Sequence, residues 1–129
     1  MTGVRRRGER GAIAIEFMLV ISMLIVVFLL MLQYAVRAHA HRIATAAAEE
    51  GLAAASAYDG TADDGRRAAE EYLGELGPGL HGTTVTATRN ASTATLSVAG
   101  EVDQLVPFLT VRVSVAVEGP VEHFVEEAP

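Results

Sequence analysis

The sequence predicts an α+β protein: a long N-terminal transmembrane helix that continues into an exposed helix, then a short helix and a small three-stranded antiparallel sheet. Three patterns predict this fold. Residues 17–36 carry no charged side chain, residues 38–58 are rich in alanine, and apolar residues alternate with polar ones in three later stretches. We expect a basic leader at 1–11, the membrane helix and its extension at 12–58, a small α+β domain at 59–119 and an acidic tail at 120–129.

The apolar run of residues 17–36 is long enough to cross a membrane. At about 1.5 Å of rise per residue, twenty residues span about 30 Å, the thickness of a bilayer's hydrocarbon core. Thirteen of them are Leu, Ile, Val or Phe, which together favour insertion by about 4–8 kcal/mol. Glu16, just before the run, opposes insertion by at most about 3 kcal/mol. The run should therefore insert, and the carboxylate needs a separate explanation.

The charges on the two sides of the run differ. Four arginines precede it and two follow it closely: Arg5, Arg6, Arg7 and Arg10, then Arg37 and Arg42. The positive-inside rule therefore predicts a cytoplasmic N-terminus, with residues 38–129 outside a bacterial cytoplasmic membrane. That outer part holds fourteen acidic and five basic residues. Such a negative surface excludes nucleic-acid binding through phosphate neutralisation.

The first helix is expected to reach about Tyr58, because no proline or glycine occurs between Ala12 and Gly51. Small residues recur at three- and four-residue spacing within its extension: Ala44, Ala47, Ala48, Gly51 and Ala55. This spacing lets another helix backbone approach closely. The same alanines would also suit a solvated helix that packs against nothing.

A second helix is predicted at residues 62–76. A break at Asp59-Gly60 precedes it, Thr61 and Asp64 have the spacing of a capping box, and Gly77-Pro78-Gly79 is a strong stop. Its apolar stripe consists of Ala69, Tyr72, Leu73 and Leu76.

Alternating residues after this helix predict three strands that form a meander. Their apolar positions are Val85 and Ala87, then Ala94, Leu96 and Val98, then Val111, Val113, Val115 and Val117. Asn90-Ala91 suits a tight connection, and residues 104–109 form a longer one. The one apolar face of this sheet needs a cover, which is most simply the second helix or the extended first helix.

No pattern in the sequence indicates catalysis or a cofactor. The chain has no cysteine, hence no disulfide, thiolate nucleophile or cysteine metal site. His39 and His41 would point about 200° apart on a helix, which does not suit a shared metal. There is no nucleophile elbow and no glycine-rich phosphate loop. We therefore expect no enzyme activity, no metal, no cofactor and no small-molecule substrate.

Glu16 carries the strongest functional indication. A cut between Gly11 and Ala12 would make Ala12 the new N-terminus and Glu16 the fifth residue. The new ammonium would then lie one helical turn from the carboxylate, and the two charges would neutralise each other within one subunit or between neighbours. Alternatively, Glu16 reaches the lipid headgroups and pairs with Arg10 or with nothing.

Arg10-Gly11, Glu16-Phe17 and the long apolar run resemble the class III signal of type IV pilin-like proteins, in which a prepilin peptidase cuts after the glycine. Residues 10–53 resemble, more narrowly, the TadE family of tight-adherence pilus proteins. That family shares the glycine, the glutamate five residues later, the membrane helix and an alanine-rich segment, here Ala46-Ala47-Ala48-Glu49-Glu50-Gly51-Leu52-Ala53. The chain departs from it at Ser22, where a proline is frequent, and near Glu49, where arginine is favoured.

The resemblance implies a minor pilin or pseudopilin, a structural component in the assembly or secretion of a tight-adherence pilus. Its implied partners are the membrane, a prepilin peptidase and other pilins or pilus-assembly proteins. Two alternatives stay open: a secreted protein with a type I signal peptide cut after Ala40, and an uncleaved single-pass membrane protein with an extracytoplasmic binding domain. The mature N-terminus distinguishes the three, since it would be Ala12, His41, or Met1 or Thr2.

Overall fold

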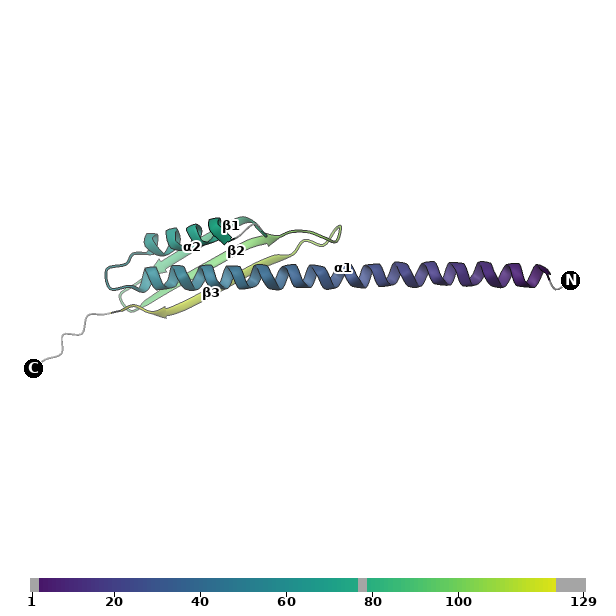
Figure 1. Ribbon diagram of the computed structural model, residues 1–129. Helices are drawn as coiled ribbons and strands as arrows, with labels where there is room; N and C mark the ends of the chain where they lie inside the picture. The colour runs from purple at the N-terminus through teal and green to yellow at the C-terminus, as the bar shows by residue number, and fades with distance from the viewer. Residues whose placement is uncertain (1–2, 77–78, 123–129) are drawn as a thin grey trace, which may run out of the picture.

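The molecule is a long helical rod with a small folded domain at one end (Figure 1). The computed structural model describes residues 3–76 and 79–122, with side chains from residue 8 onward. Its elements are α1 (Gly3–Ser56), α2 (Ala62–Leu76), β1 (Leu80–Arg89), β2 (Thr93–Val102) and β3 (Arg112–Pro120). This arrangement confirms the predicted α+β fold.

Helix α1 has two different halves. Its N-terminal half projects beyond the domain, and nearly every large apolar side chain from Ile13 to Leu32 is exposed. Its C-terminal half lies against α2 and the sheet (Figure 1). Within the described residues, α1 is the one helix long and apolar enough to span a membrane. An apolar surface around the whole circumference is what a lipid-facing helix requires.

The predicted capping box starts α2. The Thr61 amide donates to Asp64 Oδ2 at 3.0 Å, and the Asp64 amide donates to Thr61 Oγ1 at 3.1 Å. The helix then returns alongside α1 and buries Gly65, Ala69 and Leu73. Leu76, expected in the same stripe, is exposed in the last turn. Gly77 and Pro78, the expected stop, lie outside the described residues.

The sheet is the predicted antiparallel meander, in the order β1-β2-β3. Val98 in the central strand pairs with Val85 on one side and Val115 on the other. The Asn90 side chain forms the predicted tight connection by accepting hydrogen bonds from the amides of Ser92 (2.9 Å) and Thr93 (2.7 Å). Strand β1 begins earlier than its alternation indicated, because an irregularity follows His81 and breaks the period.

Both helices cover one face of the sheet. Leu96, Val98 and Val113 are its largest fully buried side chains, and they pack in one cluster with residues of α1 and α2. The opposite face carries mostly Ser, Thr and Ala, together with Glu101, Arg112 and Glu118, and is open or half-open to solvent. The expected boundary at residues 58 and 59 stays a prediction, although the core packing runs across it.

The acidic tail expected at 120–129 falls largely outside the described residues, which stop at Glu122. The chain just after β3 is held in place: the Val121 amide donates to the Ser92 carbonyl, and the Glu122 amide donates to the Ser56 carbonyl. Val121 is buried as a result of this attachment.

Candidate functional site

Gly11 and Ala12, the expected cleavage position, lie within the continuous helix α1. A side chain added at Gly11, or at Gly8 one turn earlier, would meet no atom within 4 Å. Packing in this chain therefore does not require glycine at either position. Each glycine lowers the stability of its helical turn by about 1 kcal/mol relative to alanine, which makes this end of the helix easier to unwind.

Glu16 lies one helical turn after Ala12, and its side chain is exposed. It borders a shallow surface depression with three apolar neighbours, Ile13, Phe17 and Val20. Within the described residues, no hydrogen bond or ion pair reaches its carboxylate. The structure thus presents this carboxylate on an apolar surface, where a cation from another chain or a headgroup has access to it.

The five small residues of α1 are all buried inside the domain: Ala44, Ala47, Ala48, Gly51 and Ala55. Two of them, Gly51 and Ala55, let α2 approach closely. A Cβ built on Gly51 would lie 2.7 Å from the Gly65 carbonyl oxygen, and one built on Gly65 would lie 2.6 Å from the Ala55 Cβ. The structure thus uses this stripe for packing within the chain, and the solvated alternative does not hold for it.

Gln33 forms a connection that sequence reasoning missed. It lies in the apolar run, yet its side chain is only 3% exposed. Its Nε2 donates to the Asp103 carbonyl at 3.1 Å, and its Oε1 accepts from the amides of Leu105 (2.7 Å) and Val106 (3.4 Å). The only signal in the sequence was a lone amide among apolar residues, and nothing indicated a partner some seventy positions away.

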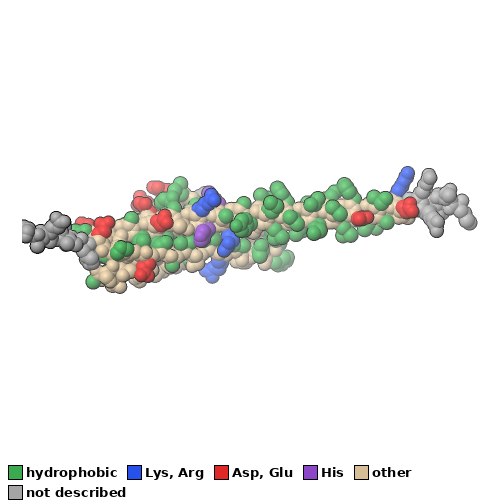
Figure 2. All heavy atoms as spheres, turned by 90° about the horizontal axis from the view of Figure 1, so that it is seen from below, with side chains coloured by type: hydrophobic (Ala, Val, Ile, Leu, Met, Phe, Trp, Pro, Cys, Tyr) green, Lys and Arg blue, Asp and Glu red, His purple; other side chains and the backbone are tan. Residues whose placement is uncertain are grey.

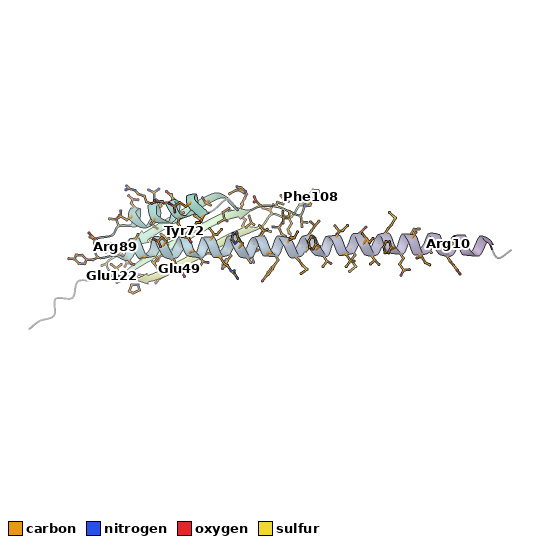
Figure 3. All side chains as sticks on the ribbon, in the orientation of Figure 1. Arg10, Glu49, Tyr72, Arg89, Phe108 and Glu122 are labelled. Carbon is orange, nitrogen blue, oxygen red and sulfur yellow. The ribbon has the colours of Figure 1, made fainter. Side chains whose placement is uncertain are left out.

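These bonds attach the β2–β3 loop, residues 103–111, to the membrane helix. The loop extends along α1 toward the bare half of the helix, the N-terminal part up to Leu32 that no other element covers (Figure 1). Its side chains Leu105, Phe108 and Leu109 are exposed, and Phe108 is fully so. Figure 3 shows Phe108 at the end of the domain that faces the N-terminal half of α1.

Charged groups gather where the bare helix meets the domain (Figure 2). Just beyond the apolar run, α1 exposes Arg37, His39, His41 and Arg42. His81 and Asp103 form an ion pair or hydrogen bond beside the start of the loop. The apolar surface therefore ends at a band of polar groups, as expected where a helix leaves the bilayer.

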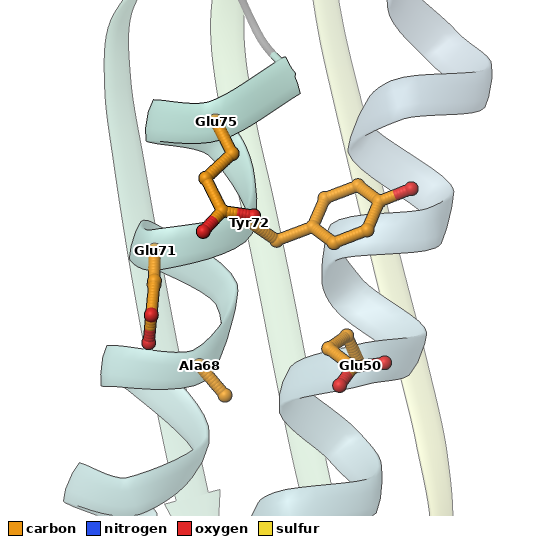
Figure 4. A pocket seen from close by; sticks show the side chains of 5 residues that line it. All are labelled: Glu50, Ala68, Glu71, Tyr72 and Glu75. Carbon is orange, nitrogen blue, oxygen red and sulfur yellow. The ribbon is translucent and has the colours of Figure 1, made fainter.

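An acidic groove lies between α1 and α2 (Figure 4). Glu50, Glu71, Glu75, Ala68 and Tyr72 line it. No three His, Asp or Glu side chains in the described part of the chain gather closely enough to hold a metal. Nothing at this groove points to a particular ligand.

Residues 11–52 match the family model described as TadE-like protein. This segment is TadE-like. It begins at Gly11, contains Glu16 and Gln33, and ends just after Gly51. The similarity to the TadE-like family concerns this part of α1. No curated protein and no solved structure matches the chain.

The TadE-like match and the single bare apolar helix together fit a single-pass membrane protein. Residues 53–129 lie outside the matched segment. The domain that α2 and the sheet build on the TadE-like helix is therefore described by the structure alone.

Proposed function

We propose that this chain is a minor pilin or pseudopilin, a structural component in the assembly or secretion of a tight-adherence pilus. The observation that carries the proposal is the TadE-like match over residues 11–52, on a helix whose N-terminal half is apolar and bare. Residues 1–11 are a leader that a prepilin peptidase removes after Gly11. The chemistry belongs to the peptidase, and this chain supplies the substrate segment and the assembled product.

The arginines before the run favour a cytoplasmic N-terminus, with the folded domain outside. The domain's negative surface is then turned away from the cytoplasm. A reporter that is active only outside the cytoplasm, fused after Pro129, tests this orientation and should be active.

The glycine at position 11 supports cleavage there, because no neighbouring atom in the fold requires a residue without a side chain at this position. A peptidase has to draw the scissile backbone out of the helix, and glycine both weakens the helix and admits a close approach. After cleavage, the Ala12 ammonium and the Glu16 carboxylate neutralise each other across neighbouring subunits. Pairing of this kind gives a charge on an apolar helix the partner it requires.

One structural observation disfavours a type I signal peptide. A cut after Ala40 would remove Gln33, Val36 and Ala40 from the folded molecule. Ala40 is 1% exposed within the core, and Val36 packs against it. Gln33 holds the β2–β3 loop. The folded domain uses these residues, so the helix on both sides of Ala40 should persist in the mature protein.

The test compares two exposed glutamates seven positions apart on α1. Glu16→Leu should insert and be processed like the parent, because it removes a cost to insertion, but it should fail to support surface pili. Glu9→Leu is the matched control: it lies in the removed leader and should leave piliation unchanged. Piliation is measured by surface labelling of pili, with membrane level and processing checked in each strain. Normal piliation by stably inserted, processed Glu16→Leu protein would contradict the charge-pairing role.

A further inference from the structure

The β2–β3 loop ends in an apolar tip consisting of Leu105, Pro107, Phe108 and Leu109. The exposed fraction of Phe108 is 102%, and that of Leu105 is 41%. The Phe108 backbone also has a φ of +69°, which is rare for a bulky residue. We propose that this tip inserts into the bilayer leaflet next to the folded domain and serves as a second membrane contact beside α1.

The attachment to Gln33 sets the depth of the tip. The apolar run continues to Val36, so Gln33 lies three residues, or about 5 Å, inside the end of the run. Leu29, one turn deeper on the same side of α1, is half-buried, unlike its neighbours Phe28 and Leu30. If the run spans the hydrocarbon core, the Leu105 and Val106 amides that bond to Gln33 lie just inside its edge, and the His81–Asp103 pair lies on the polar side of the tip.

Most amides at the tip of the loop need no hydrogen bond from water. The amides of Leu105 and Val106 donate to Gln33, and the Leu109 amide donates to the Val106 carbonyl. Pro107 has no amide hydrogen. Irregular backbone is tolerated at membrane depth only where its polar groups have partners. The amides of Leu105, Val106 and Leu109 and the carbonyl of Val106 have such partners within the molecule.

Lipid suits this tip better than a second protein chain does. The tip is continuous with the bare surface of α1, which is apolar around its circumference and itself requires lipid. Tyr34 is 71% exposed next to Gln33, and Arg37 follows one turn later. An aromatic ring followed by cations is the order expected from acyl chains to headgroups. The proposal needs α1 to span the membrane, and it does not depend on cleavage after Gly11.

Tryptophan fluorescence tests the depth of the tip, because the chain has no tryptophan of its own. The full chain is placed in vesicles of phosphatidylethanolamine and phosphatidylglycerol whose acyl chains carry bromine. Phe108→Trp reports the tip. Phe28→Trp, in the bare helix, is the reference for the bilayer core, and Tyr58→Trp, at the far end of the domain, is the reference for water. The proposal predicts blue-shifted Phe108→Trp emission that lipid bromine quenches and aqueous iodide quenches poorly.

Two results would overturn the proposal. One is Phe108→Trp emission that resembles that of Tyr58→Trp, with full quenching by iodide. The other is a blue-shifted emission that bromine does not quench and that moves to the red when the protein is diluted in lipid, since a second copy of the chain would then cover the tip. Leu109→Trp provides an independent probe of the same tip, and circular dichroism verifies the fold of each variant.

Discussion

A side-chain amide inside an apolar run must find hydrogen-bond partners, and Gln33 finds them on the backbone of residues 103–106. Glu16, the other polar residue that sequence reasoning singled out, makes no such contact within the described part of the chain. The two residues differ in purpose. Gln33 holds its own domain to the helix, whereas Glu16 remains free to meet a group from outside.

Replacing Gln33 by leucine should destabilise the domain. The change leaves one carbonyl and two amides of the loop without their partner, which costs about 1–3 kcal/mol for a buried group. The measurement is denaturant unfolding of the detergent-solubilised chain, followed by the circular dichroism of the sheet. Ser22→Ala is the control, because Ser22 bonds only to the Met18 carbonyl of its own helix. Equal stability of the parent and Gln33→Leu would show that the loop does not need this attachment.

Two glycines on α2 separate the effect of packing from that of helix propensity. A Cβ at Gly65 would meet the Gly51 carbonyl oxygen at 2.8 Å, whereas one at Gly74 would meet nothing within 4 Å. Gly65→Ala should therefore force the helices apart and lower the free energy of unfolding by about 1–3 kcal/mol. Gly74→Ala should raise it by up to about 1 kcal/mol. Denaturant unfolding measures both changes in the free energy of unfolding. An increase in stability on Gly65→Ala would contradict the close packing of α1 on α2.

The elements that local patterns control were predictable from the sequence. The capping box at Thr61, the bounds of α2 and the alternation of β2 and β3 all follow from residues within a few positions of one another. The prediction for β1 was less complete, because the irregularity after His81 interrupts the period of two.

Contacts between distant residues were not predictable. The spacing of the small residues in α1 indicated a close neighbour, but it did not specify that Gly65 of α2 and Leu96 of β2 would be that neighbour. The bonds from Gln33 to the loop join positions some seventy residues apart, and no local rule connects them. The functional role of Glu16 stays a prediction for a related reason, since its proposed partner belongs to another chain.

The whole molecule combines a TadE-like helix with a domain that packs against the C-terminal half of that helix. The α1 core residues, the Gln33 bonds and the loop all bind the domain to the helix. A force or displacement applied to the helix within a filament or assembly complex would therefore reach the domain directly. This rigid connection suits a structural subunit whose helix is held in the membrane or in the filament.

The mature N-terminus tests the central claim most directly. The chain is isolated from membranes of cells that contain a prepilin peptidase, and mass spectrometry reads its first residue. We predict that the parent begins at Ala12, that Gly11→Val keeps the leader because the β-branched side chain blocks the cut, and that Gly8→Val is still cut at Ala12. Both glycines lie in open space on α1, so neither change should disturb the fold. A parent that begins at Met1, Thr2 or His41, or a Gly11→Val chain cut like the parent, would contradict the account.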